Sequence, residues 1–299
     1  MIKKFMSHKQ LHLLMVVVAV LVCILLMKDS LWPHLLTYIK SESHINKKYT
    51  LTYTNDNKPI IVSRTDKKAY DTLRMFGRKK CQLYKHALML IKPTDCVLEI
   101  GSGYGYSTIY IAPKLVDNGH LICYDASSEM CRCLIKTLAL NDLLSYDNQH
   151  IEIRNIGLSH KKQTAFLAYK LTDTEACYVT NKLVRNREGQ HTTLYTLDSQ
   201  QLPPINVMIL DNSGSELDIL LGARQTLRDN PNMLILLQWN YRLLQFHGKP
   251  LAQLEKILEQ GYQLYKFCDN KIQRASKQEL INNEICLLIT KNPEIIETT

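Results

Sequence analysis

The sequence lacks several patterns, and each absence argues against a class of protein. Its nine cysteines form no C-x-x-C pair, and an odd count in a chain of 299 residues argues against a disulfide framework. We therefore expect a reducing compartment for the globular part. The ten histidines form no H-x-x-x-H or comparable pattern, so no metal site is expected. Asn-x-Ser/Thr sequons are also absent, which weakly disfavours a glycosylated luminal domain.

The positive charge is concentrated in the first third of the chain. The formal net charge is +9, and residues 1–100 hold 17 Lys and Arg against 7 Asp and Glu. No interleaved aromatic residues or nucleic-acid-binding motif accompany this excess, so nucleic acid is not an expected partner. A basic segment beside a hydrophobic run indicates contact with anionic lipid headgroups instead.

Residues 11–27 are almost wholly apolar, with His12 as the one interruption. About 17 helical residues reach roughly 26 Å, just enough for a thin bilayer. A cleaved signal peptide is the alternative, but no A-x-A-like cleavage site follows, and Trp32 suits the membrane–water interface. We expect residues 1–45 to be a single-pass membrane anchor with its juxtamembrane segment, followed by a domain over residues 46–299. Lysines flank both ends of the apolar run, so its orientation stays open; the reducing compartment favours the cytoplasmic face.

Strand-like and helix-like patterns alternate through the second part of the chain. Two β-rich runs predict a hairpin at residues 49–54 and 60–63, and helical spacing follows over residues 69–91. Core strands are expected from Cys96 and at residues 120–124, 151–156, 207–210 and 233–239, with helices at residues 107–116, 128–140, 215–228 and 251–260. Short strands are expected at residues 165–169, 176–180 and 192–196, and two more at residues 263–267 and 285–290. This alternation predicts an α/β fold with a Rossmann-like, doubly wound, mostly parallel sheet.

A glycine-rich turn follows the first of these strands. Gly101, Gly103 and Gly105 stand at alternate positions after an apolar run, and a helix-like pattern begins at once. A strand, a tight turn and a helix N-terminus let a backbone approach a nucleotide closely. Three acidic residues end the first, second and fourth core strands, at the sheet edge where ligands bind in such folds: Glu99, Asp125 and Asp211. Together these features predict a shared cofactor pocket.

The residues around the turn favour one cofactor over another. A dinucleotide fold requires G-x-G-x-x-G, whereas the spacing here is Gly101-x-Gly103-x-Gly105. Glu99 would repel a pyrophosphate but suits the ammonium group of a methionine moiety. Asp125 can accept hydrogen bonds from two ribose hydroxyls of either cofactor. Glu99 therefore favours S-adenosylmethionine, and the combination resembles motif I of the class I S-adenosylmethionine-dependent methyltransferases.

Two later motifs resemble the FkbM family within that class. The first is Asn155-Ile-Gly-Leu-Ser159, and the second runs from Ile209 through Asp211 and Glu216 to Ala223. The resemblance covers residues 95–239 and implies an O-methyltransferase, often acting on sugars, glycolipid-type molecules or natural products. It also implies cofactor-binding roles for one set of residues: Glu99, Gly101, Ser102, Gly103, Tyr104, Gly105, Asp125 and Asn155. Within that set, Asp125 would bind the ribose and Asn155 would lie near the adenine.

Two positions depart from the family pattern. Ser213 stands where the family usually has glutamate, and Gln238 stands where the fifth strand often ends in glutamate. Losing two carboxylates indicates either a neutral or acidic substrate or a reduced activity. A catalytically inactive, membrane-tethered binding module is therefore the alternative, and a nicotinamide-dependent oxidoreductase is a less favoured one.

Asp211 is the candidate catalytic base for deprotonating an alcohol. A role only in placing the cofactor, or in capping a helix, is the competing interpretation. Asp211 and the adjacent Asn212 would be too few ligands for magnesium. The expected anchor at residues 11–27 favours a lipid-linked or membrane-bound acceptor, because tethering raises the local concentration.

Overall fold

A computed structural model describes residues 48–64, 66, 83–144, 150–168, 178–180, 190–268 and 271–294. The chain divides into two compact units, residues 1–46 and 47–299, and every described residue lies in the second. The anchor predicted at residues 11–27 lies outside the described residues, and so does most of the helix predicted at residues 69–91. Within the described ranges, no helix has the length and apolar character needed to cross a membrane.

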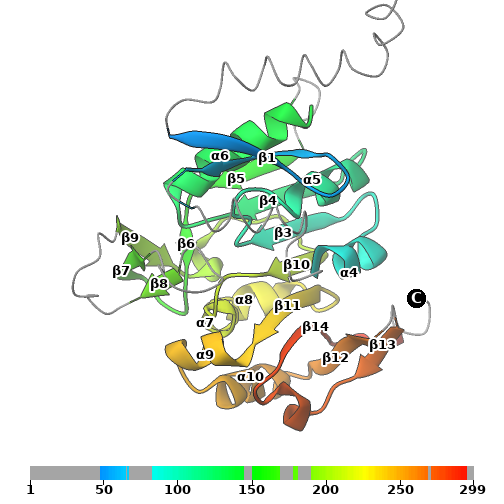
Figure 1. Ribbon diagram of the computed structural model, residues 1–299. Helices are drawn as coiled ribbons and strands as arrows, with labels where there is room; N and C mark the ends of the chain where they lie inside the picture. Colours follow the sequence, from blue (N-terminus) through cyan, green and yellow to red (C-terminus); the bar gives the residue numbers. More distant parts are fainter. Residues whose placement is uncertain are drawn as a thin grey trace, which may run out of the picture. The chain divides into compact units, whose positions relative to one another are not determined.

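An eight-stranded mixed sheet forms the centre of the second unit (Figure 1). Its strand order is β13-β12-β14-β11-β10-β3-β4-β5. The five parallel strands are β3 (Cys96–Ile100), β4 (His120–Tyr124), β5 (Ile151–Arg154), β10 (Val207–Leu210) and β11 (Leu234–Asn240). In chain order they read 3-2-1-4-5 across the sheet, which is the doubly wound arrangement. These strands lie where the sequence predicts them.

Three antiparallel strands extend the sheet beyond β11. They are β12 (Gln263–Cys268), β13 (Lys271–Arg274) and β14 (Glu284–Thr290). β14 pairs antiparallel with β11 on one side and with β12 on the other. A dinucleotide fold built from two βαβαβ halves has its sixth strand parallel at this place. β13 was not predicted, because its sequence carries charged residues at both ends of the strand.

Helices cover both faces of the sheet, and the central strands are therefore buried throughout. Each residue of β3 and of β10 is buried, which explains their unbroken apolar sequences. The longer helices are α4 (Leu83–Leu90), α6 (Ser128–Leu140), α9 (Tyr241–His247) and α10 (Pro250–Leu258). The segment predicted as one helix at residues 107–116 is a short helix α5 (Thr108–Ile111) followed by the 3-10 turn η1 (Ala112–Lys114). α9 was not predicted.

The hairpin predicted near the start of the domain is present and packs on α6 (Figure 1). Its strands are β1 (Tyr49–Tyr53) and β2 (Pro59–Ser63). The backbone N–H of Ile61 donates to Thr137 Oγ1 at 3.0 Å, and Ser63 Oγ donates to Glu129 Oε1 at 2.8 Å. Lys48 Nζ lies 2.5 Å from the other oxygen of Glu129. One acidic side chain of α6 thus holds the hairpin at two points.

The short strands after β5 form a second sheet of their own. Its order is β6-β9-β7-β8, with bounds β6 (Gly157–Leu158), β7 (Gln163–Ala168), β8 (Tyr178–Thr180) and β9 (Gln190–Tyr195). The sequence predicts three of these strands but not their pairing. The fourth, β6, begins two residues after Asn155 and connects the second sheet to the edge of the first.

The prediction of a single helix at residues 215–228 is wrong. Two helices occupy this stretch: α7 (Glu216–Leu221) and α8 (Arg224–Asp229). A side chain at Gly222 would place its Cβ 2.2 Å from the backbone oxygen of Ser159, so the helix passes the second sheet only because this residue is glycine. Asp198, in the 3-10 turn η2 (Leu197–Ser199), then caps the start of α8 from a distance. Its carboxylate accepts the backbone N–H groups of Gln225 at 3.0 Å and Thr226 at 2.8 Å.

Substituting Asp198 with alanine is expected to lower the free energy of unfolding by about 1–2 kcal/mol, as other lost N-caps do. Two backbone donors at the start of α8 would lose their acceptor. Chemical denaturation of the full-length chain measures the change. Asp229→Ala is the matched control, because Asp229 is at the other end of α8 and accepts an exposed bond from Gln225 Nε2. Equal stability of the two variants would contradict the capping role.

Candidate functional site

The glycine turn follows β3 and is hydrogen-bonded to the carboxyl end of β4. All three glycines adopt positive φ: Gly101 at 86°, Gly103 at 54° and Gly105 at 87°. The N–H groups of Gly101 and Ser102 both donate to the carbonyl of Tyr124, at 2.9 and 3.2 Å. The turn is also pressed against the end of β10, because a Cβ at Gly101 would lie 2.2 Å from the backbone oxygen of Asp211.

Asp125 ties the glycine turn to the start of α6. Its Oδ2 accepts from the backbone N–H of Gly103 at 2.9 Å, and its Oδ1 accepts from that of Ser127 at 2.8 Å. Asn155 Nδ2 donates to the backbone oxygen of Asp125 at 2.9 Å. The structure therefore brings Gly103, Asp125 and Asn155 together at one edge of the sheet. The two backbone N–H groups thus fix the Asp125 carboxylate beside the glycine turn.

Glu99 is 2% exposed and holds the first turn of α5. One of its oxygens accepts from Ser107 Oγ at 2.5 Å and the other from Thr108 Oγ1 at 2.7 Å. The Cys123 thiol lies 3.6 Å from the second oxygen, and burial, with a contribution from Glu99, raises the pKa of that thiol well above its usual value. Each oxygen of Glu99 thus already has a hydroxyl partner, which the sequence did not indicate.

Two of the predicted cofactor-binding residues have side chains that point into the protein. Tyr104 is 9% exposed, and its hydroxyl donates to Asp66 Oδ2 at 2.8 Å. Ser102 is 4% exposed, and its Oγ donates to the backbone oxygen of Tyr124 at 3.3 Å. Only the backbone of these residues is left to face a ligand. Asp66, which the sequence analysis missed, braces the turn from the segment after the hairpin.

A small pocket lies at the carboxyl ends of β3 and β10. Its lining residues are Leu83, Tyr84, Glu99, Ile100, Gly101, Tyr106, Ser107, Ile209 and Asp211. Three predicted site residues, Glu99, Gly101 and Asp211, are among them. Asp125 and Asn155 are not, and they lie on the side of the glycine turn toward β4 and β5.

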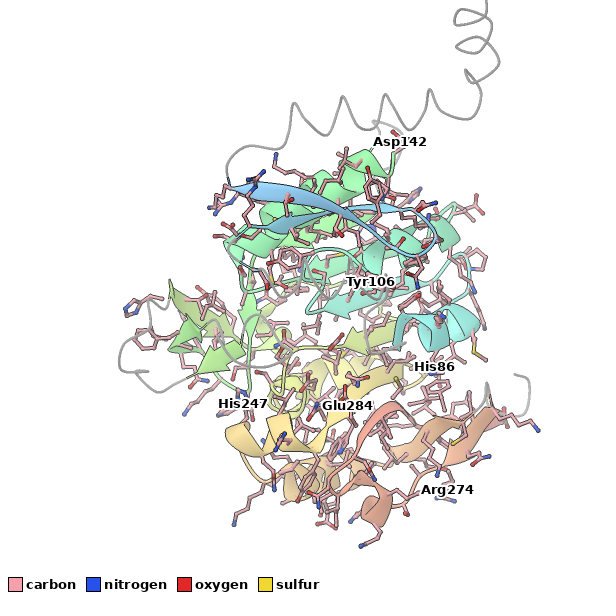
Figure 2. The ribbon with its side chains drawn as sticks, in the orientation of Figure 1. His86, Tyr106, Asp142, His247, Arg274 and Glu284 are labelled. Carbon is pink, nitrogen blue, oxygen red and sulfur yellow. The ribbon has the colours of Figure 1, made fainter. Side chains whose placement is uncertain are left out.

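A tyrosine cluster forms one wall of this pocket. The rings of Tyr84 and Tyr106 meet edge to face with centroids 5.6 Å apart, and Tyr84 stacks on Tyr110 at 4.9 Å. Tyr106 is labelled in Figure 2. Burial is the main cause of the raised pKa values of Tyr84 and Tyr110, so both phenols stay protonated at neutral pH. The contribution of α4 to this wall was not predicted, although its helical spacing of apolar residues was the available signal.

A tight turn presents Asp211 to the pocket. Ser213 adopts φ 53° and Gly214 φ 101°, and the chain folds back over Glu216 at the start of α7. Glu216 Oε1 accepts the backbone N–H groups of Asn212 at 2.7 Å and Gly214 at 3.1 Å. Glu216 is 2% exposed, and burial raises its pKa to about 7.

The two departures from the FkbM pattern occupy different environments. Ser213 is at the left-handed position of the tight turn. Gln238, on β11, is 8% exposed; its Nε2 donates to Glu284 Oε1 at 3.2 Å and its Oε1 accepts from the Cys286 thiol at 3.3 Å. Glu284, labelled in Figure 2, therefore brings a carboxylate from β14 next to the position where the family often has one on the fifth strand.

Two histidines, His86 of α4 and His160 after β6, lie outside the pocket. His86 stacks on Phe267 with ring centroids 4.1 Å apart. His160 Nδ1 lies 3.7 Å from Asp218 Oδ1.

Comparison with known proteins gives structural similarities at low identity. No model of a protein family matches the sequence, and no curated protein matches it. The methyltransferase FkbM from Methylobacillus flagellatus KT has 13% identity and a TM-score of 0.44, with 68% of this chain and 45% of that chain covered. The O-methyltransferase from Bacillus cereus in complex with SAH has 12% identity and a TM-score of 0.41, covering 71% and 80%.

Ribosomal protein L11 methylase from Lactobacillus delbrueckii subsp. bulgaricus has 16% identity and a TM-score of 0.39, covering 70% of this chain and 76% of that one. The chain thus spans less than half of the FkbM structure and larger shares of the other two. At these identities and TM-scores, the similarity identifies neither the family nor the activity of the chain.

Proposed function

We propose that the chain is an S-adenosylmethionine-dependent methyltransferase. The observation that carries this proposal is the composition of the pocket, whose lining residues include Glu99, Asp211, Tyr84 and Tyr106. Carboxylates and aromatic faces attract cations, and the cofactor carries a sulfonium and an ammonium group. None of the described residues that line this pocket is basic, and a pyrophosphate would meet two like charges there.

The geometry of the glycine turn supports the same proposal. Gly101 lets the backbone pass close to the pocket, and Asp125, on the β4 side of the turn, offers a carboxylate to which ribose hydroxyls can donate. Asn155 lies beside Asp125, where an adenine attached to that ribose would extend. The cofactor's methionine end would then lie toward Glu99 and its nucleoside end toward Asp125.

Within such a site, the chain's own residues would align and deprotonate the acceptor. When bound, the cofactor supplies a methyl group already activated by its positive sulfonium. Asp211 would accept the proton of the acceptor hydroxyl, because it lines the pocket at the end of β10. Tyr84 and Tyr106 would exclude water from the same space.

The acceptor that we propose is a sugar, a glycolipid or another small hydroxylated molecule near a membrane. Support comes from the anchor expected at residues 11–27 and from the FkbM-like motifs around Asn155 and Asp211. We place the catalytic domain on the cytoplasmic face of a single-pass membrane protein, because the cysteine pattern favours a reducing compartment. Nucleic acid is not among the proposed partners.

Calorimetry on the full-length chain tests the cofactor. We expect S-adenosylmethionine and S-adenosylhomocysteine to bind with a Kd on the order of 10 µM, in the usual range for enzyme ligands. NAD should give no heat of binding, because its pyrophosphate would be opposed by Glu99 and Asp211. Binding of NAD without binding of S-adenosylhomocysteine would contradict the proposal.

A catalytically inactive, membrane-tethered binding module is the second candidate. Ser213 and Gln238 favour it, since each replaces a carboxylate of the family pattern. Glu284 argues against it, because it supplies a carboxylate 3.2 Å from Gln238 Nε2. Transfer of labelled methyl groups into membrane or glycolipid extracts separates the two candidates, since only an active enzyme labels a product.

A further inference from the structure

The turn that presents Asp211 encloses one buried carboxyl group. Glu216 is the first residue of α7, and its side chain folds back to accept two backbone N–H groups of the turn, from Asn212 and Gly214. The same turn contacts the cofactor side of the site, because Asp211 O and Asn212 Oδ1 would lie 2.2 and 3.2 Å from a Cβ at Gly101. The position of Asp211 therefore depends on the two hydrogen bonds that Glu216 accepts from the turn.

The second oxygen of this carboxyl group is buried without a hydrogen-bond partner among the described residues. A buried polar atom without a partner is rare and costly, most of all on an ionised group. A neutral carboxyl group reduces this cost and still offers Oε1 as an acceptor for both N–H groups.

The groups that most affect the ionisation of Glu216 include no positive charge. Asp211 precedes the turn and raises the pKa of Glu216 further, and Asp218 lies on the same helix. His247 of α9 approaches the turn, with its Cδ2 3.1 Å from where a Cβ of Gly214 would lie. Burial lowers the pKa of His247 and so disfavours a charged ring at this position.

We propose that Glu216 is a positioning residue whose neutral carboxyl group closes the turn of residues 212–214 and so fixes Asp211 at the pocket. Ionisation of Glu216 would open this turn, because the charged group gains more from water than from two backbone donors. The closing of the turn is independent of which ligand binds, whereas its consequence for catalysis rests on the proposed methyltransferase function.

The direction of the pH effect follows from linkage. In the closed turn the pKa of Glu216 is raised from 4.5 to about 7, whereas in an opened, hydrated turn it returns toward 4.5. The closed form binds the proton more tightly, so closure is strongest below pH 4.5 and weakens as the pH rises to 7. Between pH 6 and pH 8 the opening equilibrium should increase about 10-fold and then level off.

Amide hydrogen exchange on the full-length chain tests this directly. Protection factors of the Asn212 and Gly214 amides in the wild type should fall about 10-fold between pH 6 and pH 8. Glu216→Gln should keep the low-pH protection at every pH, because an amide oxygen accepts the same bonds and cannot ionise. In Glu216→Ala the protection factors should be about 10-fold below the wild-type value at low pH, and should stay there at every pH, because both donors lose their acceptor.

Glu255→Gln is the control, since Glu255 is an exposed residue of α10 paired with Lys277. It should leave the protection of the turn as in the wild type. A Glu216→Gln variant that keeps the wild-type pH dependence would overturn the proposal, and so would wild-type protection in Glu216→Ala. Binding of S-adenosylhomocysteine, measured in parallel, should weaken about 10-fold in Glu216→Ala and remain unchanged in Glu216→Gln. If the wild type does not bind this ligand, the proposed function fails alone, because the exchange experiment requires no ligand.

Discussion

Replacing Gly101 with alanine is expected to lower the free energy of unfolding by about 3 kcal/mol or more. The residue has φ 86°, which is unfavourable for any residue with a Cβ, and the added methyl group would lie 2.2 Å from the backbone oxygen of Asp211. A backbone oxygen cannot rotate away as a flexible side chain can. Relief of the clash would separate the glycine turn from the end of β10 and distort the pocket. Thermal unfolding measures the effect, and the midpoint should fall by roughly 10 °C.

Gly103→Ala is the matched control for that experiment. Gly103 also has positive φ, at 54°, but the nearest atom to its would-be Cβ is the Gly101 oxygen at 4.0 Å. The control therefore carries backbone strain without the clash and should cost about 1 kcal/mol. Similar losses in both variants would indicate that strain alone, and not the contact between β3 and β10, determines the requirement for glycine at position 101.

Substituting Glu99 with glutamine is expected to weaken binding of S-adenosylmethionine about 100-fold, while the midpoint of thermal unfolding changes by only a few degrees. Glutamine keeps the shape of the side chain and one acceptor for the hydroxyls of Ser107 and Thr108. It removes the negative charge that would stabilise the positive cofactor in a buried site. Calorimetry gives the affinity, and circular dichroism during heating gives the stability.

Glu129→Gln serves as the control for Glu99→Gln. Glu129 also accepts a hydroxyl bond, from Ser63, but it lies on α6 against the hairpin and not in the pocket. It should leave cofactor affinity unchanged. A Glu99→Gln variant with wild-type affinity would assign Glu99 a purely structural role at the start of α5.

Much of the central sheet could be predicted because its strands carry local signals. Fully buried parallel strands require continuous apolar runs, and β4 and β10 have the bounds that their sequences indicate. The start of α6 was equally clear, since Ser127 is an N-cap whose Oγ accepts from Met130 N–H at 3.3 Å. The break between α7 and α8 had one local signal, Gly222 at the C-cap of α7, but its physical reason is not local. It depends on Ser159 and Asp198, which come close to this segment only in the folded chain.

The site shows the same division between local and distant information. The positions of Glu99, Asp125 and Asp211 at strand ends follow from alternating strands and helices. The contacts of these carboxylates do not follow from that pattern. The partners of Glu99, for example, are hydroxyls whose orientation depends on where α5 begins. The position of the Glu284 carboxylate beside Gln238 could not be predicted from the sequence either, since it depends on antiparallel pairing between β11 and β14.

The insertion of β14 between β11 and β12 has a consequence for synthesis on the ribosome. β14 is the last described strand of the chain, yet it pairs with six residues of β11 and four of β12. Until residue 290 has emerged, the apolar edge of β11 has no neighbour on that side, and open edges of this kind recruit other chains. A nascent chain stopped at residue 283 should therefore bind chaperones or aggregate, although all five parallel strands have already been made.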